Sequence, residues 1–142
     1  MNVLILGSGG REHCFAELIS KSKHCDKLFV APGNSGTSLM AQNLDFSPID
    51  FDLVKGAITK HNIQLVVVGP EDPLVSGIHD FIVSDPVLKG VKVIGPKQQA
   101  AQLEGSKDFA KNFLNRHNIP TAKHQTFTTR QFEEACEYIE NN

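Results

Sequence analysis

The sequence has almost no excess charge. It carries 14 Lys and Arg residues against 16 Asp and Glu residues, which gives a formal net charge of -2. Proteins that bind duplex nucleic acid neutralise many phosphates with clustered basic side chains, and this sequence has no basic run. We therefore expect no nucleic-acid partner.

Long hydrophobic runs are also missing. The longest apolar stretches, residues 3–6 and 65–68, are far shorter than the roughly 20 residues that a membrane-spanning helix needs. The N-terminus lacks the basic segment and the long apolar segment of a secretory signal. These absences predict a soluble, cytoplasmic protein without a membrane partner.

Cysteine is scarce, and the potential metal ligands are scattered. Cys14, Cys25 and Cys136 are odd in number and form no CxxC pair, and the six histidines form no HExxH pattern. A disulfide framework or a zinc site would need paired or regularly spaced ligands. We therefore expect reduced thiols and no metal ligand in this chain.

What the sequence does contain is an alternation of strand-like and helix-like segments. The apolar patterns predict strands over residues 2–6, 27–31, around 44–46, 63–68 and 91–94, with 122–127 a further candidate. They predict helices over 11–22, after Asp50, over 74–83, over 98–118 with a break near 105–106, and over 129–139. Alternation of this kind builds right-handed βαβ units. The expected fold is α/β, with an open, mostly parallel, Rossmann-like sheet flanked by helices.

The chain divides into two parts by composition, which changes after Pro96. A length of 142 residues suits one domain with the start of another. We expect an α/β domain over residues 1–100, followed by a linker and the beginning of a second domain over 101–142.

Three glycine-rich turns follow predicted strands: the first turn (residues 7–10), the second turn (32–36) and the third turn (69–73). In open α/β sheets, ligands bind beyond the carboxyl ends of the strands. Since parallel strands end at the same edge, the three turns could wall a single pocket.

The first turn suits a phosphate. Gly7, Gly9 and Gly10 let an anion approach the main chain, and the following helix N-terminus favours negative charge. Arg11 adds a cation where the helix dipole alone would prefer an acid. The alternative is a tight strand-to-helix connection that needs glycine for its backbone alone.

A dinucleotide site is disfavoured, although residues 7–9 begin the G-x-G-x-x-G fingerprint. The third glycine position holds Glu12, which we expect to crowd the approach of helix to strand. The second strand also lacks the acidic residue that NAD sites use for the ribose.

The other two turns carry polar side chains with two readings each. Asn34 suits a hydroxyl-rich ligand, but Asn is equally a common left-handed turn residue. Glu71 and Asp72 could complement a helix N-terminus, accept hydrogen bonds from ribose hydroxyls, or bind an ammonium group. Together the three turns describe a pocket for a small phosphorylated sugar.

The motifs GSGGREH (7–13), APGNSG (31–36) and PEDPLVSG (70–77) resemble, in order and spacing, the signatures of the phosphoribosylamine–glycine ligases, or glycinamide ribonucleotide synthetases. Residues 95–96 and AAQLEGSK (100–107) continue the resemblance, which covers nearly the whole chain. It implies an ATP-dependent carbon–nitrogen ligase of purine biosynthesis. Such enzymes join glycine to 5-phosphoribosylamine, giving glycinamide ribonucleotide, ADP and phosphate.

The resemblance also implies roles for single residues. Ser8, Gly9 and Gly10 would hold the 5-phosphate through main-chain amides, and Asn34, Glu71 and Asp72 would face the ribose or its amine. The substrate-binding residues that we expect are Ser8, Gly9, Gly10, Arg11, Asn34, Gly36, Glu71 and Asp72. Lys107 resembles a lysine that reaches a nucleotide phosphate, with a solvated helix lysine as the alternative. The role of His13 stays open.

Members of this family are ATP-grasp enzymes and are considerably longer than 142 residues. We therefore expect an N-terminal fragment that ends just inside the ATP-grasp domain, is inactive alone and contains no catalytic residue. ATP and Mg (or Mn) would serve the full-length enzyme, with the metal ligands beyond Asn142. Fused or neighbouring purine-pathway domains occur in such proteins. The alternatives are another ATP-grasp ligase of purine or amino-acid metabolism, and a flavodoxin-like or nicotinamide-binding module.

Overall fold

A computed structural model of the chain describes residues 1–141. They form two compact units, one over residues 1–105 and one from residue 106 onward. The first unit contains the sheet and all three glycine-rich turns. The assignment of an α/β domain to 1–100 and of the start of an ATP-grasp domain to 101–142 stays a prediction.

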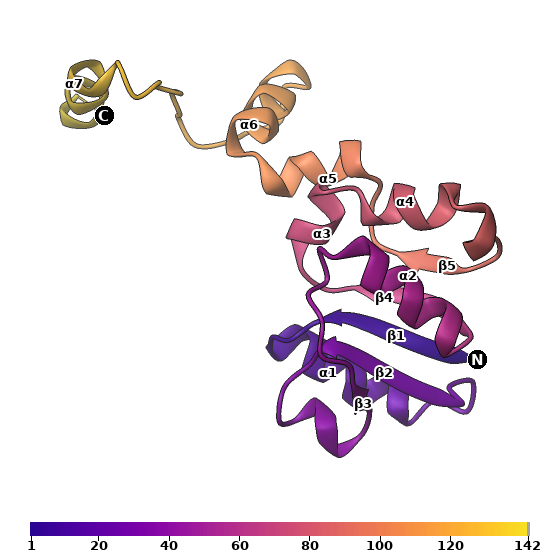
Figure 1. Cartoon of the computed structure of the whole chain (residues 1–142). Helices are drawn as coiled ribbons and strands as arrows, with labels where there is room; N and C mark the ends of the chain where they lie inside the picture. Colours follow the sequence, from indigo (N-terminus) through magenta and orange to yellow (C-terminus); the bar gives the residue numbers. More distant parts are fainter. Residues whose placement is uncertain (142) are drawn as a thin grey trace. The chain divides into compact units, whose positions relative to one another are not determined.

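The first unit is built on a five-stranded, all-parallel sheet (Figure 1). Its strands are β1 (Asn2–Gly7), β2 (Lys27–Pro32), β3 (Gln42–Asn43), β4 (Ile63–Val68) and β5 (Lys92–Ile94). They are arranged in the order β3-β2-β1-β4-β5, so the chain runs outward from β1 on one side and then on the other. The α/β fold with a mostly parallel sheet is confirmed, and every strand pair is parallel.

Helices connect the strands. In the first unit these are α1 (Gly10–Ser20), α2 (Phe51–Lys60), α3 (Glu71–Val75), α4 (Ile78–Ser84) and α5 (Gln98–Gly105), with short 3-10 turns η1 (Thr37–Leu39) and η2 (Pro86–Leu88). The second unit contains α6 (Lys107–Arg116) and α7 (Phe132–Glu140). Among the helices of residues 1–141, none combines the length and the apolar character needed to cross a bilayer.

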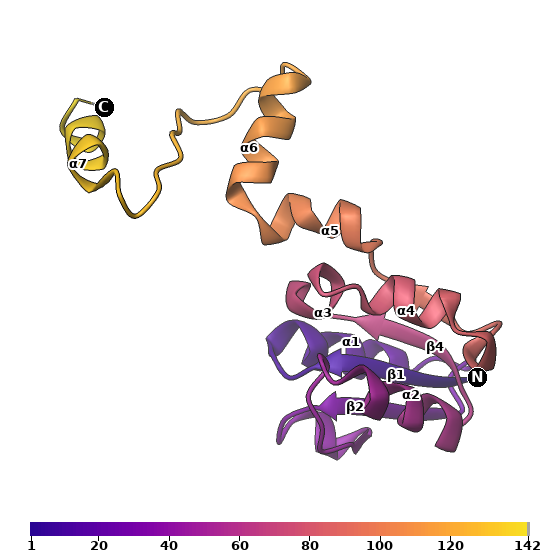
Figure 2. The ribbon, with the colours of Figure 1, turned by 45° about the horizontal axis from the view of Figure 1, so that its top comes forward.

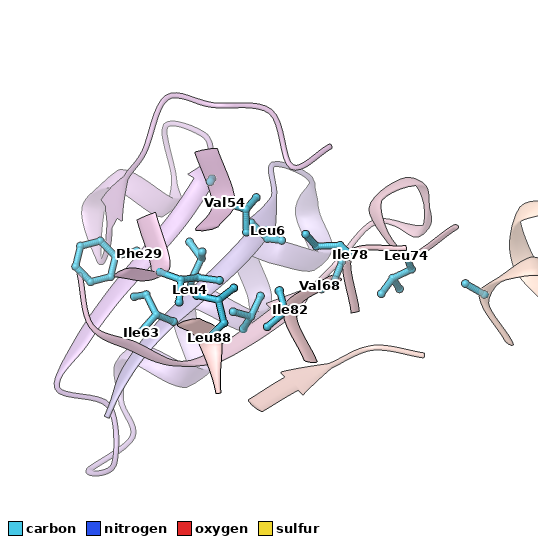
Figure 3. Packing of buried hydrophobic residues seen from close by; sticks show 14 residues of the cluster. Leu4, Leu6, Phe29, Val54, Ile63, Val68, Leu74, Ile78, Ile82 and Leu88 are labelled. Atoms are coloured by element: carbon cyan, nitrogen blue, oxygen red, sulfur yellow. The ribbon is translucent and has the colours of Figure 1, made fainter. Parts of the chain in front are cut away.

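The central strand β1 is buried on both faces because its side chains alternate. Val3 and Ile5 point into a cluster with Ala16 of α1, whereas Leu4 and Leu6 point into a larger cluster formed by α2, α3, α4 and α5. Figures 1 and 2 show α1 and α2 on opposite faces of the sheet, and Figure 3 shows Leu4 and Leu6 within the larger cluster. Each fully buried aliphatic side chain contributes about 1.5–3 kcal/mol.

The predicted helix over 74–83 is two helices, α3 and α4, separated at Gly77. Gly77 has φ +99° and is buried, and a left-handed residue cannot continue a right-handed helix. Its backbone turns α4 away from α3, so that Ile78 and Ile82 reach the larger cluster. The break near residues 105–106 was predicted, and Ser106 there accepts a hydrogen bond from Phe109 N–H as the N-cap of α6.

Two strand predictions were wrong. The third strand is β3 at Gln42–Asn43 and not the stretch around 44–46. Leu44 N–H still donates to Val30 O at 2.8 Å, but the pairing ends there, and the Leu44 and Phe46 side chains pack against the larger cluster. Residues 122–127 form no strand in the described part of the chain. In this segment, side chains supply the bonds: Lys111 Nζ donates to Ala122 O, and Thr126 Oγ1 donates to Asp108 Oδ1.

Gly77 offers a test of the helix break. A Cβ at residue 77 would lie 3.3 Å from Gln98 Cδ on a backbone that L residues rarely adopt, so Gly77→Ala should lower the free energy of unfolding by about 1 kcal/mol or more. Gly56→Ala is the matched control, since Gly56 lies inside α2 with open space around it. This change should raise the free energy of unfolding by about 0.5–1 kcal/mol. Urea unfolding of both variants measures the difference. Equal stabilisation by both variants would show that the left-handed backbone at residue 77 does not require glycine.

Candidate functional site

An open pocket of about 440 Å³ lies at the carboxyl edge of the sheet. It sits where the chain direction across the sheet reverses, between β1 and β4, which is the usual ligand position in such folds. Its lining comes from all three glycine-rich turns and from the loop after β3: Gly7, Ser8, Gly9, Glu12, Pro32, Ser47, Pro48, Ile49, Pro70, Asp72 and Pro73.

The loop Ser47–Ile49 also lines this pocket, although none of its residues was expected there from the sequence. Its position in the chain could have indicated this, because the loop follows the third strand of a parallel sheet and the carboxyl ends of such strands share one edge. Of the eight expected substrate-binding residues, Ser8, Gly9 and Asp72 line the pocket. The other five lie in the same turns or in the first turn of α1.

The first turn leads directly into the N-terminus of α1. Gly9 is the N-cap, with an extended backbone, and the first intrahelical bond runs from His13 N–H to Gly9 O at 3.1 Å. The N–H groups of Gly10, Arg11 and Glu12 therefore have no acceptor within the helix. Such amides form an anion-binding end in which the helix dipole adds to the attraction.

Glu12 lines the pocket and is not among the substrate-binding residues expected from the sequence. Its side chain is only 4% exposed, and its Oε2 accepts a hydrogen bond of 2.7 Å from Gly9 N–H. The expected crowding does not occur, because a Cβ at Gly7 or Gly69 would overlap the Glu12 side chain and neither residue has one. The signal that could have found this is Glu at the third helical position, which often bonds back to the N-cap amide.

This contact changes what the first turn can offer to a ligand. Gly9 N–H is already donated to Glu12 Oε2, so it is not a free donor for a phosphate. The amides of Gly10 and Arg11, at the exposed start of α1, are the donors that the helix leaves open. Ser8 adds an exposed hydroxyl at the same place.

Arg11 joins the first turn to the third. Its Nε lies 3.3 Å from Glu12 Oε1, and its Nη2 lies 4.0 Å from Glu71 Oε2. The Arg11 side chain is 53% exposed, so these pairs are weak, and a guanidinium has five N–H donors to share. Arg11 can therefore contact both acids and still present donors to an anion.

Asn34 braces the second turn and binds the first. Its Oδ1 accepts hydrogen bonds from Gly36 N–H at 2.8 Å and Thr37 N–H at 3.0 Å, and its Nδ2 donates to Ser8 O at 2.8 Å. Asn34 does not have a positive φ, so it is not a left-handed turn residue, which was the alternative interpretation of this position. Its amide group works as a connector between two turns.

Gly36 and His13 lie against each other. A Cβ at residue 36 would overlap the imidazole ring of His13, so glycine is what allows α1 and the second turn to approach. The half-buried His13 lies beside the second turn, and its side chain does not line the pocket. This contact gives His13 a packing role, which the sequence had left open.

Glu71 and Asp72 begin α3 and face different partners. Glu71 lies opposite Arg11, whereas Asp72 is exposed and lines the pocket. The described residues donate no hydrogen bond to the Asp72 carboxylate, so it can accept hydroxyl or ammonium protons from a ligand.

The remaining candidate groups lie outside the pocket. Lys107 is the exposed first residue of α6, in the second unit. Within residues 1–141, no three His, Cys, Asp or Glu side chains are grouped to hold a metal ion. The three cysteines are free, and burial raises the pKa of the Cys25 thiol above its usual range.

The space around Glu12 gives a testable prediction. Gly69→Ala should displace the Glu12 carboxylate and lower the free energy of unfolding by about 1–3 kcal/mol, as overpacking of a buried site does. Gly10→Ala is the matched control, because a Cβ there meets nothing within 4 Å, and it should change stability by less than about 0.5 kcal/mol. Thermal and urea unfolding measure both variants. A Gly69→Ala protein as stable as the control would show that Glu12 is not confined by this backbone.

Comparison with known proteins gives consistent matches. The family model described as phosphoribosylglycinamide synthetase, N domain, matches residues 1–104. The phosphoribosylamine–glycine ligase of Rhodopirellula baltica is 46% identical over 140 residues, which cover 99% of this chain and 31% of the relative. A bifunctional purine biosynthetic protein of Pichia angusta is 42% identical, covering 100% of this chain and 18% of its own.

A solved structure extends the match to three dimensions. The crystal structure of phosphoribosylamine–glycine ligase from Thermotoga maritima superposes with a TM-score of 0.65 at 27% identity, covering 97% of this chain and 30% of that one. This chain thus spans less than a third of the length of these relatives. The family model covers most of this chain, and all three turns carry the motifs that suggested the family. The chain therefore belongs to the phosphoribosylglycinamide synthetase family, N domain.

Proposed function

We propose that this chain is the N-terminal part of an ATP-dependent ligase that joins glycine to 5-phosphoribosylamine, and that its pocket binds the phosphoribosylamine. One observation carries the proposal: the three motif-bearing turns wall a single pocket at the switch point of the sheet. The names of the relatives support the reaction. The pocket's size and the polar groups of Ser8 and Asp72 in its lining support a small phosphorylated sugar.

The 5-phosphate is placed at the N-terminus of α1 in this proposal. Gly10 and Arg11 donate main-chain N–H groups, Ser8 offers its hydroxyl, and the Arg11 guanidinium adds positive charge. The Gly9 amide serves indirectly, because it is held by Glu12. This arrangement binds a dianion with backbone donors and a helix end, so it needs no basic surface.

The ribose and its amine are assigned to the acidic side of the pocket. Asp72 supplies a carboxylate with free acceptor sites, which suits ribose hydroxyls or the amine. Glu71 and Asn34 support the turns on either side, with Arg11 and Ser8 as their respective partners. Gly36 is assigned to the packing of the second turn, against His13.

The other substrates are assigned to a longer parent protein. When bound, ATP supplies the phosphoryl group that activates the glycine carboxylate. Within residues 1–141, no three His, Cys, Asp or Glu side chains are grouped to hold a metal ion, and the ligands of the Mg or Mn that would accompany ATP are assigned to the longer parent. Lys107 is the one residue here proposed to reach a nucleotide phosphate, and the chain alone is expected to be inactive.

Two features of the chain support a second domain that begins near residue 106. The helices α6 and α7 bury none of their described residues, and isolated helices of this length are marginal without tertiary packing. Phe132 and Ile139 of α7 are 74% and 75% exposed. We infer that these apolar side chains pack within a larger ATP-grasp domain. We also infer that the parent enzyme is cytoplasmic. Relatives named as bifunctional purine biosynthetic proteins support fusion to other purine-pathway domains in part of the family.

The phosphate assignment can be tested on this chain by isothermal titration with ribose 5-phosphate. Gly10→Pro removes one N–H at the first helical position, where proline fits the backbone, and should weaken binding about tenfold. Gly10→Ala keeps the N–H and should bind within about threefold of the wild type. Equal binding by the two variants would move the phosphate away from α1, and no binding by the wild type would contradict the pocket assignment.

The reaction can be tested with a longer protein that begins with these 142 residues. Given glycine, ATP and phosphoribosylamine, it should form glycinamide ribonucleotide, detected by mass spectrometry, while the 142-residue chain should not. Asp72→Asn in the longer protein should raise KM for phosphoribosylamine at least about tenfold, since one charged hydrogen bond is worth about 1.5–3 kcal/mol. Product formed from another amino acid or another ribonucleotide would favour a different ATP-grasp ligase.

A further inference from the structure

One side chain from α1 and one from the second turn hold opposite ends of one peptide group. Between Ser8 and Gly9, the Ser8 carbonyl oxygen accepts a hydrogen bond of 2.8 Å from Asn34 Nδ2. The N–H of the same peptide group, on Gly9, donates to Glu12 Oε2 at 2.7 Å. Both bonds lie directly in front of α1, next to the open amides of Gly10 and Arg11.

This peptide group would be free to rotate without those contacts. Gly9 lacks a Cβ, so rotation about its φ and about the ψ of Ser8 meets little steric resistance. A flipped peptide would turn the Ser8 carbonyl towards the Glu12 carboxylate and the Gly9 N–H towards the Asn34 amide nitrogen. Both encounters are repulsive, so the two side chains favour a single orientation.

Each side chain is itself fixed. Glu12 is 4% exposed and lies in space left by Gly7 and Gly69, at the ends of β1 and β4. Asn34 is fixed by the two N–H groups that its Oδ1 accepts in the second turn. The peptide orientation is thus determined by all three turns.

We propose that Glu12 and Asn34 are paired positioning residues, which clamp the Ser8–Gly9 peptide so that the neighbouring amides face the phosphate of the ligand. The inference rests on the proposed function and adds two residues that act through a peptide group. Neither side chain has to touch the ligand. Affinity is gained because the turn is ordered before the anion arrives.

The experiment measures ribose 5-phosphate affinity together with hydrogen exchange at the Gly9 amide, in the 142-residue chain. In Asn34→Ser, the hydroxyl can still accept from the second turn but is too short to reach Ser8 O. We expect about tenfold weaker binding and at least about tenfold faster exchange at Gly9 in this variant, matching the loss of one hydrogen bond.

Changes at Glu12 provide the second arm. Glu12→Gln keeps an acceptor for Gly9 N–H and should bind within about threefold of the wild type, whereas Glu12→Ala should lose about tenfold. Since both side chains act on one peptide, combining Glu12→Ala with Asn34→Ser should cost much less than the product of the single losses.

Asn43→Ser is the matched control. Asn43 Nδ2 donates to Asn34 O at 2.9 Å, so this change loosens the same turn without touching the clamped peptide. It should leave the affinity and the Gly9 exchange within about twofold of the wild type. Thermal unfolding of every variant separates loss of the fold from loss of the clamp.

Each outcome has one meaning. If the wild type binds ribose 5-phosphate and folded Asn34→Ser binds it equally well, the clamp is wrong and the proposed function stands. If the wild type does not bind it, the proposed pocket is wrong and the positioning role falls with it. Equal weakening by Asn34→Ser and Asn43→Ser would also overturn the clamp, because general loosening of the turn would then be sufficient.

Discussion

The arrangement of the turns at the carboxyl edge of this sheet depends on the buried carboxylate of Glu12. Taking a carboxylate out of water is costly unless it is hydrogen-bonded and paired. Here Gly9 N–H and the Arg11 guanidinium face it, and it lies in the first turn of α1, where the helix dipole favours negative charge. Its position requires glycine at residues 7 and 69, so two strand ends and a helix start are specified together.

Backbone hydrogen bonds add to the side-chain contacts between the turns around this carboxylate. Gly33 N–H donates to Gly7 O at 3.1 Å, and Gly69 N–H donates to Leu6 O at 3.0 Å. These bonds extend the parallel ladders of β1 by one step on each side. Because β1 is buried on both faces, its end is a rigid base, and the pocket is built from short loops on that base. Backbone groups in such short loops can be held in defined positions without long side chains.

The sequence determined the sheet and the family. Four strands, β1, β2, β4 and β5, are short and mostly apolar, and each ends at or just before a glycine or proline. β4 is apolar enough to be buried on both faces, so the parallel arrangement followed from alternation with helices. The order and spacing of three motifs identified the family, since each motif is local in the chain. Local signals also located the break before α6, where Ser106 caps the helix. The local pattern did not predict the helix break at Gly77 or the position of β3, because packing against other elements decides both.

Only the tertiary structure decided how the turns share their hydrogen bonds. The sequence offered Gly9 as a phosphate donor and Asn34 as a ligand contact, but folding brings Glu12 to the first and the Ser8 carbonyl to the second. It also turned Glu12 from an expected obstacle into a buried support, because residue 69, far away in the chain, leaves room for it. The physical reason is that a hydrogen-bonding group binds whichever partner the fold brings nearest, and no periodicity or motif records that distance.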